Sequence, residues 1–214
     1  MITLGVLISG SGTNLQAIID RIADRSLDAR IGVVISNRPD VRGLERARAA
    51  GIAAEVIDHR AFADRASFET ALATRLRAAG IELVVLAGFD RLVTQVLLAA
   101  FPGRIINIHP ALLPAFKGLH AQRQAVEYGV RVAGATVHFV DADVDHGPII
   151  LQAAVPVDQD DTPETLTARI LAVEHQIYPA AIQLFAEGRL TVEGRHVRIG
   201  GTRPPLPPPL VRRA

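Results

Sequence analysis

The first half of this 214-residue chain alternates short apolar runs with segments of helical periodicity. Apolar residues recur three or four positions apart, as on one face of a helix, in residues 15–22, 42–50, 68–79 and 94–100. Strand-length apolar runs occupy residues 2–8, 31–35, 54–57, 83–87 and 104–109. Strands that alternate with helices form a parallel sheet covered by helices on both faces, because each crossover lays a helix on the sheet.

The pattern changes after residue 114. Helical spacing in residues 121–128 is followed by strand-like runs at 130–140 and 148–157, joined by a polar turn, which predicts an antiparallel pair. A last helix begins at Thr162, with Pro163 at its first position, and is predicted to end at Glu187. We predict a single Rossmann-like α/β domain, mostly parallel, with an antiparallel extension in the C-terminal half. The proline-rich residues 203–209 lie in an expected loose tail.

Composition excludes several classes of function. The formal net charge of +1 gives no reason to expect nucleic acid or an anionic membrane as a partner. The chain has no cysteine, which excludes disulfides, thiolate metal sites and a cysteine nucleophile. We see neither a basic leader nor an apolar run of membrane-spanning length, so we expect a cytoplasmic protein.

Two polar residues interrupt the apolar run at residues 104–109. Asn107 and His109 are two positions apart, so on a strand their side chains share one face, opposite Ile106 and Ile108. Two buried hydrogen-bonding groups require partners, and a substrate can supply them. The alternative is structural, with Asn107 supporting a loop and His109 satisfied inside the core.

A glycine-containing turn, residues 9–14, joins the first predicted strand to the first helix. Ligands of open α/β sheets bind beyond the carboxyl ends of strands, and a helix N-terminus there favours an anion such as phosphate. The turn is not a dinucleotide fingerprint, because Leu15 takes the place of the third glycine, and no lysine follows as in a P-loop. A glycine turn with a purely steric role is the alternative.

An acidic turn, residues 141–148, contains Asp141, Asp143 and Asp145. It is either a solvated loop or the source of a carboxylate for His109. A calcium loop does not fit the spacing. A carboxylate beside an imidazole orients the ring and favours its protonated form, which suits a general acid near neutral pH. Physical reasoning from the sequence does not choose among the three aspartates. Asp145 is nearest the sharp turn at Gly147 and Pro148, so it is the least suited to a freely solvated position.

With these residues the chain resembles the phosphoribosylglycinamide formyltransferases, within the folate-dependent formyltransferase family. The resemblance covers residues 3–193 and is carried by four stretches: 7–16, 86–120, 137–150 and 174–179. It implies a formyltransferase domain at 1–193, with a phosphate-binding half at 1–100 and a folate and catalytic half at 101–193. Residues 194–214 would form the loose tail.

The resemblance also implies the roles of individual residues. The proton donor would be His109, with Asp145 raising its pKa and Asn107 contacting the formyl donor. Residues that would hold the phosphorylated substrate are Gly12, Thr13, Asn14 and Glu174. Residues that would contact the folate are Arg65, Asp90, Arg91, Leu92, Val93 and Asn107.

The implied reaction is formyl transfer from the co-substrate 10-formyltetrahydrofolate to the amine of N1-(5-phospho-D-ribosyl)glycinamide in de novo purine (IMP) biosynthesis. Asn107 and His109 would donate to the developing oxyanion. The implied reaction needs neither a metal nor a covalent enzyme intermediate. The expected partners are the small-molecule substrates, and the expected protein is a monomer or a homodimer. Alternatives are a related formyltransferase with another acceptor, a formyltetrahydrofolate hydrolase, or a noncatalytic nucleotide-binding module.

Two positions depart from the family pattern. Asp90 stands where the family commonly has an apolar residue, often methionine, which puts side-chain packing against the folate in question. His146 follows Asp145 where a small or neutral residue is usual. His138, on a predicted strand, either faces the site or has a structural role.

Overall fold

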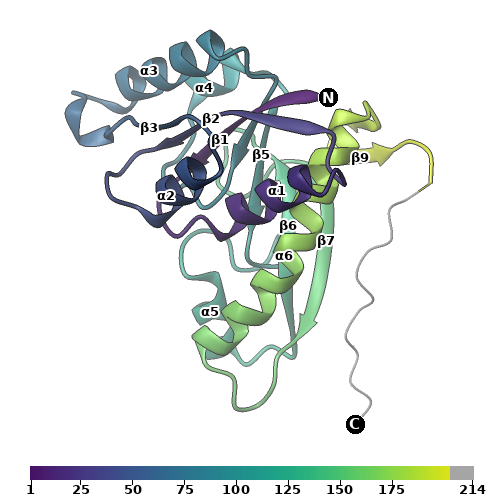
Figure 1. Ribbon diagram of the computed structural model, residues 1–214. Coiled ribbons are helices and arrows are strands. Elements are labelled where there is room, and N and C mark those ends of the chain that lie inside the picture. The colour runs from purple at the N-terminus through teal and green to yellow at the C-terminus, as the bar shows by residue number, and fades with distance from the viewer. Residues whose placement is uncertain (203–214) are drawn as a thin grey trace. The chain divides into compact units, whose positions relative to one another are not determined.

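The computed structural model describes residues 1–202, which form two compact units (Figure 1). The first comprises Met1–Asn107 and Phe139–Ala142, and the second comprises Ile108–His138 and the chain from Asp143 onward. The first unit extends through Asn107 because residues 105–107 pair in register with β4.

The first unit contains parallel strands in the order β3-β2-β1-β4-β5. Each crossover between successive strands contains a helix, as the alternating pattern predicted. The helix between β2 and β3 is the short α2. A single 3₁₀ turn, His59–Ala61, follows β3. The elements are β1 (Ile2–Ile8), α1 (Thr13–Ala23), β2 (Ala29–Ser36), α2 (Arg42–Ala49), β3 (Ala54–Val56), α3 (Arg65–Ala78), β4 (Leu83–Leu86), α4 (Gln95–Ala100) and β5 (Ile105–His109).

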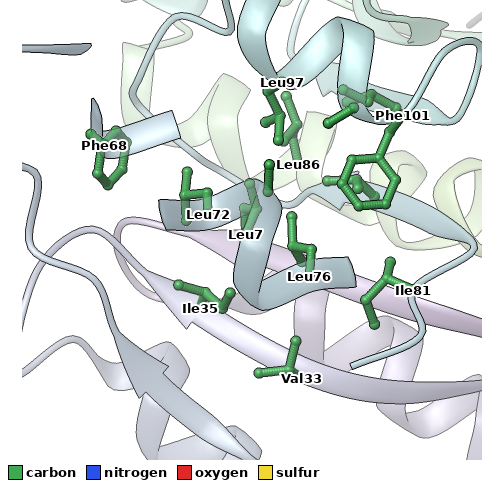
Figure 2. Close-up of a cluster of buried hydrophobic side chains, with 14 residues drawn as sticks. Leu7, Val33, Ile35, Phe68, Leu72, Leu76, Ile81, Leu86, Leu97 and Phe101 are labelled. Carbon is green, nitrogen blue, oxygen red and sulfur yellow. The ribbon is translucent and has the colours of Figure 1, made fainter. Parts of the chain in front are cut away.

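Helices α3 and α4 cover one face of these strands, and α1 and α2 cover the other (Figure 1). Figure 2 shows the core beneath α3 and α4, where Phe68, Leu72 and Leu76 meet strand residues such as Leu7 and Leu86. Leu76 is fully buried, and truncating such a residue to alanine typically costs about 2–5 kcal/mol of stability. This burial holds the strands whose carboxyl ends carry the candidate site.

The second unit contains the antiparallel pair expected from the sequence. Strand β6 pairs with β7 from Val132 opposite Pro156 to Val137 opposite Leu151. The predicted start of the last helix is also confirmed, because the Thr162 side chain accepts from the Thr165 N–H and Pro163 occupies the first turn. The elements are α5 (Ala121–Tyr128), β6 (Val132–Phe139), β7 (Ile149–Pro156), α6 (Pro163–Ala186), β8 (Leu190–Glu193) and β9 (His196–Ile199).

The expected loose tail at 194–214 is wrong for its first residues. Strand β9 pairs antiparallel with β8 and touches β7 at Ile149, so the predicted boundary at 193 cuts a hairpin. Both strands are four residues long and mostly exposed. Their residues do alternate between apolar and polar, but four residues are at the short end of what identifies a strand in sequence. The proline-rich residues 203–209 lie outside the described residues. The predicted α/β class, mostly parallel with an antiparallel extension, is confirmed.

Candidate active site

The glycine loop of the first unit leads from β1 directly into α1. Gly12 has a φ of 68°, in the left-handed region that favours glycine, and its carbonyl accepts the first helical bond, from Gln16 at 2.9 Å. The N–H groups of the first helical turn, starting at Thr13, do not bond within the helix, because the donors of a first turn have no preceding carbonyl. Together with the helix dipole they suit an anion.

A polar cluster joins the ends of three strands in the first unit. The Ser9 hydroxyl lies 2.5 Å from Asn37 Oδ1 and 2.9 Å from Asp90 Oδ1, and the Asn37 amide donates to the same Asp90 oxygen at 2.9 Å. The Arg38 guanidinium pairs with the other Asp90 oxygen. The polar residue that departs from the family pattern is therefore held by hydrogen bonds from its own unit.

Burial acts to raise the pKa of Asp90, but the hydrogen bonds from Ser9 and Asn37 and the charge of Arg38 outweigh it and lower the pKa. The carboxylate therefore stays ionised at neutral pH. The Asp90 N–H also donates to the Ser9 hydroxyl at 2.9 Å. These bonds link the start of the expected folate segment, residues 90–93, to the strand end that opens the glycine loop.

The far end of the same segment is held by Glu69, a residue that the sequence reasoning missed. Glu69 is buried on α3, and its carboxylate accepts from the Thr94 N–H at 2.7 Å, the Thr94 hydroxyl at 2.6 Å and the Leu97 N–H at 3.1 Å. A carboxylate at this helix start satisfies donors that α4 leaves free. The available signal was an acidic residue three and seven positions before Leu72 and Leu76, on the apolar face of the helix.

The other expected folate residues differ in their surroundings. Val93 packs against the core cluster of the first unit, whereas Leu92 is exposed. Arg65 is exposed as the first residue of α3. The structure thus places residues 90–93 in one loop, whereas Arg65 lies on α3.

In the second unit, His109 and Asp145 lie together. His109 is only 5% exposed, and its Nδ1 lies 3.2 Å from Asp145 Oδ2. Its Nε2 lies 2.8 Å from the carbonyl oxygen of Phe116. The Gly118 N–H donates to Asp145 Oδ2 at 2.8 Å. Both neighbours of the ring are acceptors, so a ring that donates to both is the imidazolium form.

A second histidine faces the same carboxylate. His138 on β6 is buried, and its Nε2 lies 3.8 Å from Asp145 Oδ1. Of the two roles that the sequence left open for His138, this position favours the one at the site. The sequence could not decide it, because the contact depends on where residue 145 enters the unit.

Burial and charge compete in setting the ionisation of these groups. Burial lowers the pKa of His109, and this effect outweighs the Phe116 carbonyl and the Asp145 charge, which both act to raise it. The expected influence of Asp145 on His109 is therefore present, but the pKa of His109 ends below 6.5. For Asp145, burial acts to raise the pKa, but His138, the Gly118 N–H and His109 together lower it.

The chain that follows His109 is braced by two side chains from the antiparallel strands. The Thr136 hydroxyl donates to the Ala111 carbonyl at 2.6 Å and accepts from the Leu113 N–H at 3.0 Å. The Gln152 amide donates to the Leu113 carbonyl at 3.0 Å and to the Thr136 oxygen at 2.9 Å. These bonds fix the backbone of residues 111–113, which follows His109 in the chain.

The remaining expected residues lie as follows. Asn107 is half-buried on β5, where it pairs in register with Leu86. Glu174 is buried on α6, 4% exposed. His146, the second departure from the family pattern, is contacted by Arg195, which donates to the His146 carbonyl at 2.5 Å. The His146 ring also lies 3.7 Å from Asp143.

Within residues 1–202, no group of three or more histidine and acidic side chains is arranged to hold a metal ion. In the same described part of the chain, no helix is both long and apolar enough to cross a membrane.

The model of the formyl transferase family matches residues 3–182. The chain belongs to the formyl transferase family. The predicted family membership is therefore confirmed. This family member is 44% identical over 203 residues to phosphoribosylglycinamide formyltransferase of Escherichia coli (strain K12), and the alignment covers 95% of each chain.

A solved structure and a longer human relative agree with this assignment. Glycinamide ribonucleotide transformylase 1 from Symbiobacterium toebii is 64% identical, with a TM-score of 0.92, over 93% of this chain and 94% of that one. The trifunctional purine biosynthetic protein adenosine-3 of Homo sapiens is 49% identical over 185 residues. The alignment covers 86% of this chain but only 18% of the human protein, which is much longer.

Proposed function

We propose that this formyl transferase moves the formyl group of 10-formyltetrahydrofolate to the amine of N1-(5-phospho-D-ribosyl)glycinamide, a step of de novo purine biosynthesis. The observation that carries the proposal is the buried His109 with its Nδ1 3.2 Å from Asp145. The name and near-complete alignment of the Escherichia coli relative support the choice of acceptor.

The reaction needs an oxyanion to be stabilised and a proton to be moved. The glycinamide amine attacks the formyl carbon, its C–N bond forms, and the bond from that carbon to N10 of the folate breaks. The amine loses a proton and N10 gains one. Asn107 is proposed as a donor to the oxyanion, and one such donor is typically worth about 100- to 1,000-fold in turnover.

His109 is proposed as the group that relays the proton, with Asp145 as its positioning partner. Asp145 stays ionised, since its pKa is lowered, so it orients the ring and favours the imidazolium against the cost of burial. The Phe116 carbonyl occupies Nε2, so proton transfer through that nitrogen requires a substrate atom or water to replace the carbonyl.

The two substrates are assigned to different segments. The phosphate is assigned to Gly12, Thr13 and Asn14, with Glu174 on the ribonucleotide. The folate is assigned to Arg65, residues 90–93 and Asn107. The polar cluster around Asp90 supports a folate contact through the backbone of residues 90–93, because the Asp90 carboxylate is already bonded to Ser9, Asn37 and Arg38.

A turnover assay with both substrates tests the proposal. We expect formylated glycinamide ribonucleotide to accumulate in step with loss of the formyl group from the folate. Formate release without formylated product would point to a hydrolase. Turnover only with another amine, such as an amino sugar nucleotide, would point to a related transferase, and either result would overturn the proposed acceptor.

A further inference from the structure

We propose that Arg46 and Gly43, both on α2, position the glycine loop for a phosphate group. Arg46 acts here as a positioning residue, through the backbone of the loop. The inference deepens the proposed function, and it rests on that function only for the identity of the phosphorylated substrate.

Helix α2 binds two successive carbonyl groups of the loop. The Gly43 N–H donates to the Gly10 carbonyl at 3.1 Å, and Arg46 Nε donates to the Ser11 carbonyl at 2.9 Å. Neither donor was singled out by the sequence, because α2 is separated from the loop by the whole of α1 and β2.

These two bonds set the direction of the N–H groups that follow. In a planar trans peptide the C=O and the next N–H point in opposite directions. Because the Gly10 and Ser11 carbonyls point at α2, the N–H groups of Ser11 and Gly12 point away from it. Successive N–H groups directed to one side, at the start of a helix, form an anion-binding concavity.

Glycine at position 43 allows this close approach. A Cβ on Gly43 would lie 2.5 Å from Ile8 Cδ1, 3.1 Å from the Gly10 carbonyl oxygen and 3.3 Å from Gly12 Cα. A Cβ on Gly12 would lie 2.6 Å from Gly43 Cα. The loop and α2 therefore touch backbone to backbone. A Cβ at Gly12 would clash with the backbone of α2, and a Cβ at Gly43 would displace the end of the Ile8 side chain and crowd the loop backbone.

Arg46 also links the loop to the helix that follows it. Its Nη1 donates to Gln16 Oε1 at 3.1 Å, one turn into α1. Among residues 1–202, no carboxylate lies within ion-pairing distance of this guanidinium. Its positive charge therefore adds to the field that favours a phosphate at the loop.

A purely structural role for Arg46 predicts a different result from a positioning role. If Arg46 only joined α2 to α1, its loss would lower thermal stability and affect both substrates alike. If it positions the loop, its loss weakens phosphate binding selectively. The test is to compare Arg46→Ala, Arg46→Gln and Arg46→Lys with Arg48→Ala, an exposed arginine on the same helix.

Three quantities are measured for each variant: KM for each substrate, kcat, and the affinity for inorganic phosphate by calorimetry. We expect Arg46→Ala and Arg46→Gln to raise KM for the phosphorylated substrate and Kd for phosphate by a similar factor, roughly 10- to 100-fold, as for a charge-assisted hydrogen bond. KM for the folate and kcat should change less than threefold. Arg46→Lys should restore part of the affinity, and Arg48→Ala should match the wild type.

Equal changes in both KM values, an unchanged phosphate Kd in Arg46→Gln, or no phosphate binding by the wild type would overturn the inference. The phosphate measurement does not depend on formyl transfer. If the wild type turns over no glycinamide ribonucleotide but Arg46→Gln still weakens phosphate, the proposed acceptor fails while the positioning role stands.

Discussion

The glycine loop and the His109 region are proposed to bind their ligands by opposite means. The loop offers backbone N–H groups, whose direction is set by two carbonyls bonded to α2. The His109 region offers side chains, with an imidazole and a carboxylate 3.2 Å apart and both shielded from solvent. The proposed phosphate site uses groups that do not titrate, and the proposed catalytic site uses groups that do.

This difference predicts how each region responds to mutation. A backbone site should tolerate the loss of a side chain but not the addition of a Cβ where two backbones touch. A side-chain site should lose its chemistry with a single truncation and should depend on pH. The four predictions below test this contrast, beginning with the largest expected effect.

His109→Ala should reduce kcat by about 100- to 10,000-fold, because a positioned acid–base group contributes that much to proton transfer. KM for the phosphorylated substrate should change little, since the loop is intact. His196→Ala, on exposed β9, is the control. Steady-state kinetics together with a thermal melt of each variant separate lost chemistry from lost folding, and a near-normal kcat would remove His109 from the mechanism.

Asp145→Asn should lower the pKa of His109 further, because the carboxylate charge acts to raise that pKa against burial. Fewer rings are then protonated at pH 7. Activity that needs the imidazolium should fall roughly tenfold, as expected when a hydrogen bond to a charged group is weakened, and the limb of the kcat profile that declines with rising pH should move to lower pH.

Asp143→Asn is the matched control for this pH shift, because the Asp143 side chain is 78% exposed in the same turn. Its kcat profile should overlay that of the wild type. A kcat profile that shifts to higher pH in Asp145→Asn, or one that shifts equally in both variants, would contradict the assigned role of Asp145.

Gly12→Ala should destabilise the protein by about 1–3 kcal/mol and raise KM for the phosphorylated substrate, because a Cβ at φ 68° is strained and lies 2.6 Å from Gly43 Cα. Gly51→Ala has a similar φ of 71° with open space around the Cβ. It should therefore show the strain alone. Chemical unfolding and KM measure the two effects, and equal behaviour of both variants would argue against the close approach.

Thr13→Ala should have the smallest effect, raising KM for the phosphorylated substrate about 3- to 10-fold with kcat preserved, as expected for one lost hydrogen bond. The backbone donors remain in place. Thr70→Ala, an exposed threonine on α3, is the control. An unchanged KM would exclude the Thr13 side chain from the site, and a loss as large as that of Gly12→Ala would break the contrast between backbone and side-chain sites.

Local patterns were enough to predict most of the fold. The limits of β1 and α5 agree with the predicted residues, and most other elements agree to within a few residues at each end. Apolar periodicity is a local property that burial makes visible in sequence. The hairpin β8–β9 was missed although its residues alternate between apolar and polar, because each strand is only four residues long and mostly exposed.

The sequence by itself determined the α/β class, the glycine loop after β1 and the candidate pair Asn107 and His109, because these depend on residue type and spacing along the chain. Asp145 was chosen from its acidic turn through the family resemblance. Only the tertiary structure decided that α2 holds the loop, that Glu69 holds the start of α4, and that His138 faces Asp145. It also decided that burial outweighs Asp145 in setting the pKa of His109. These outcomes depend on contacts between distant residues and on exclusion of water, and neither quantity is encoded in local periodicity.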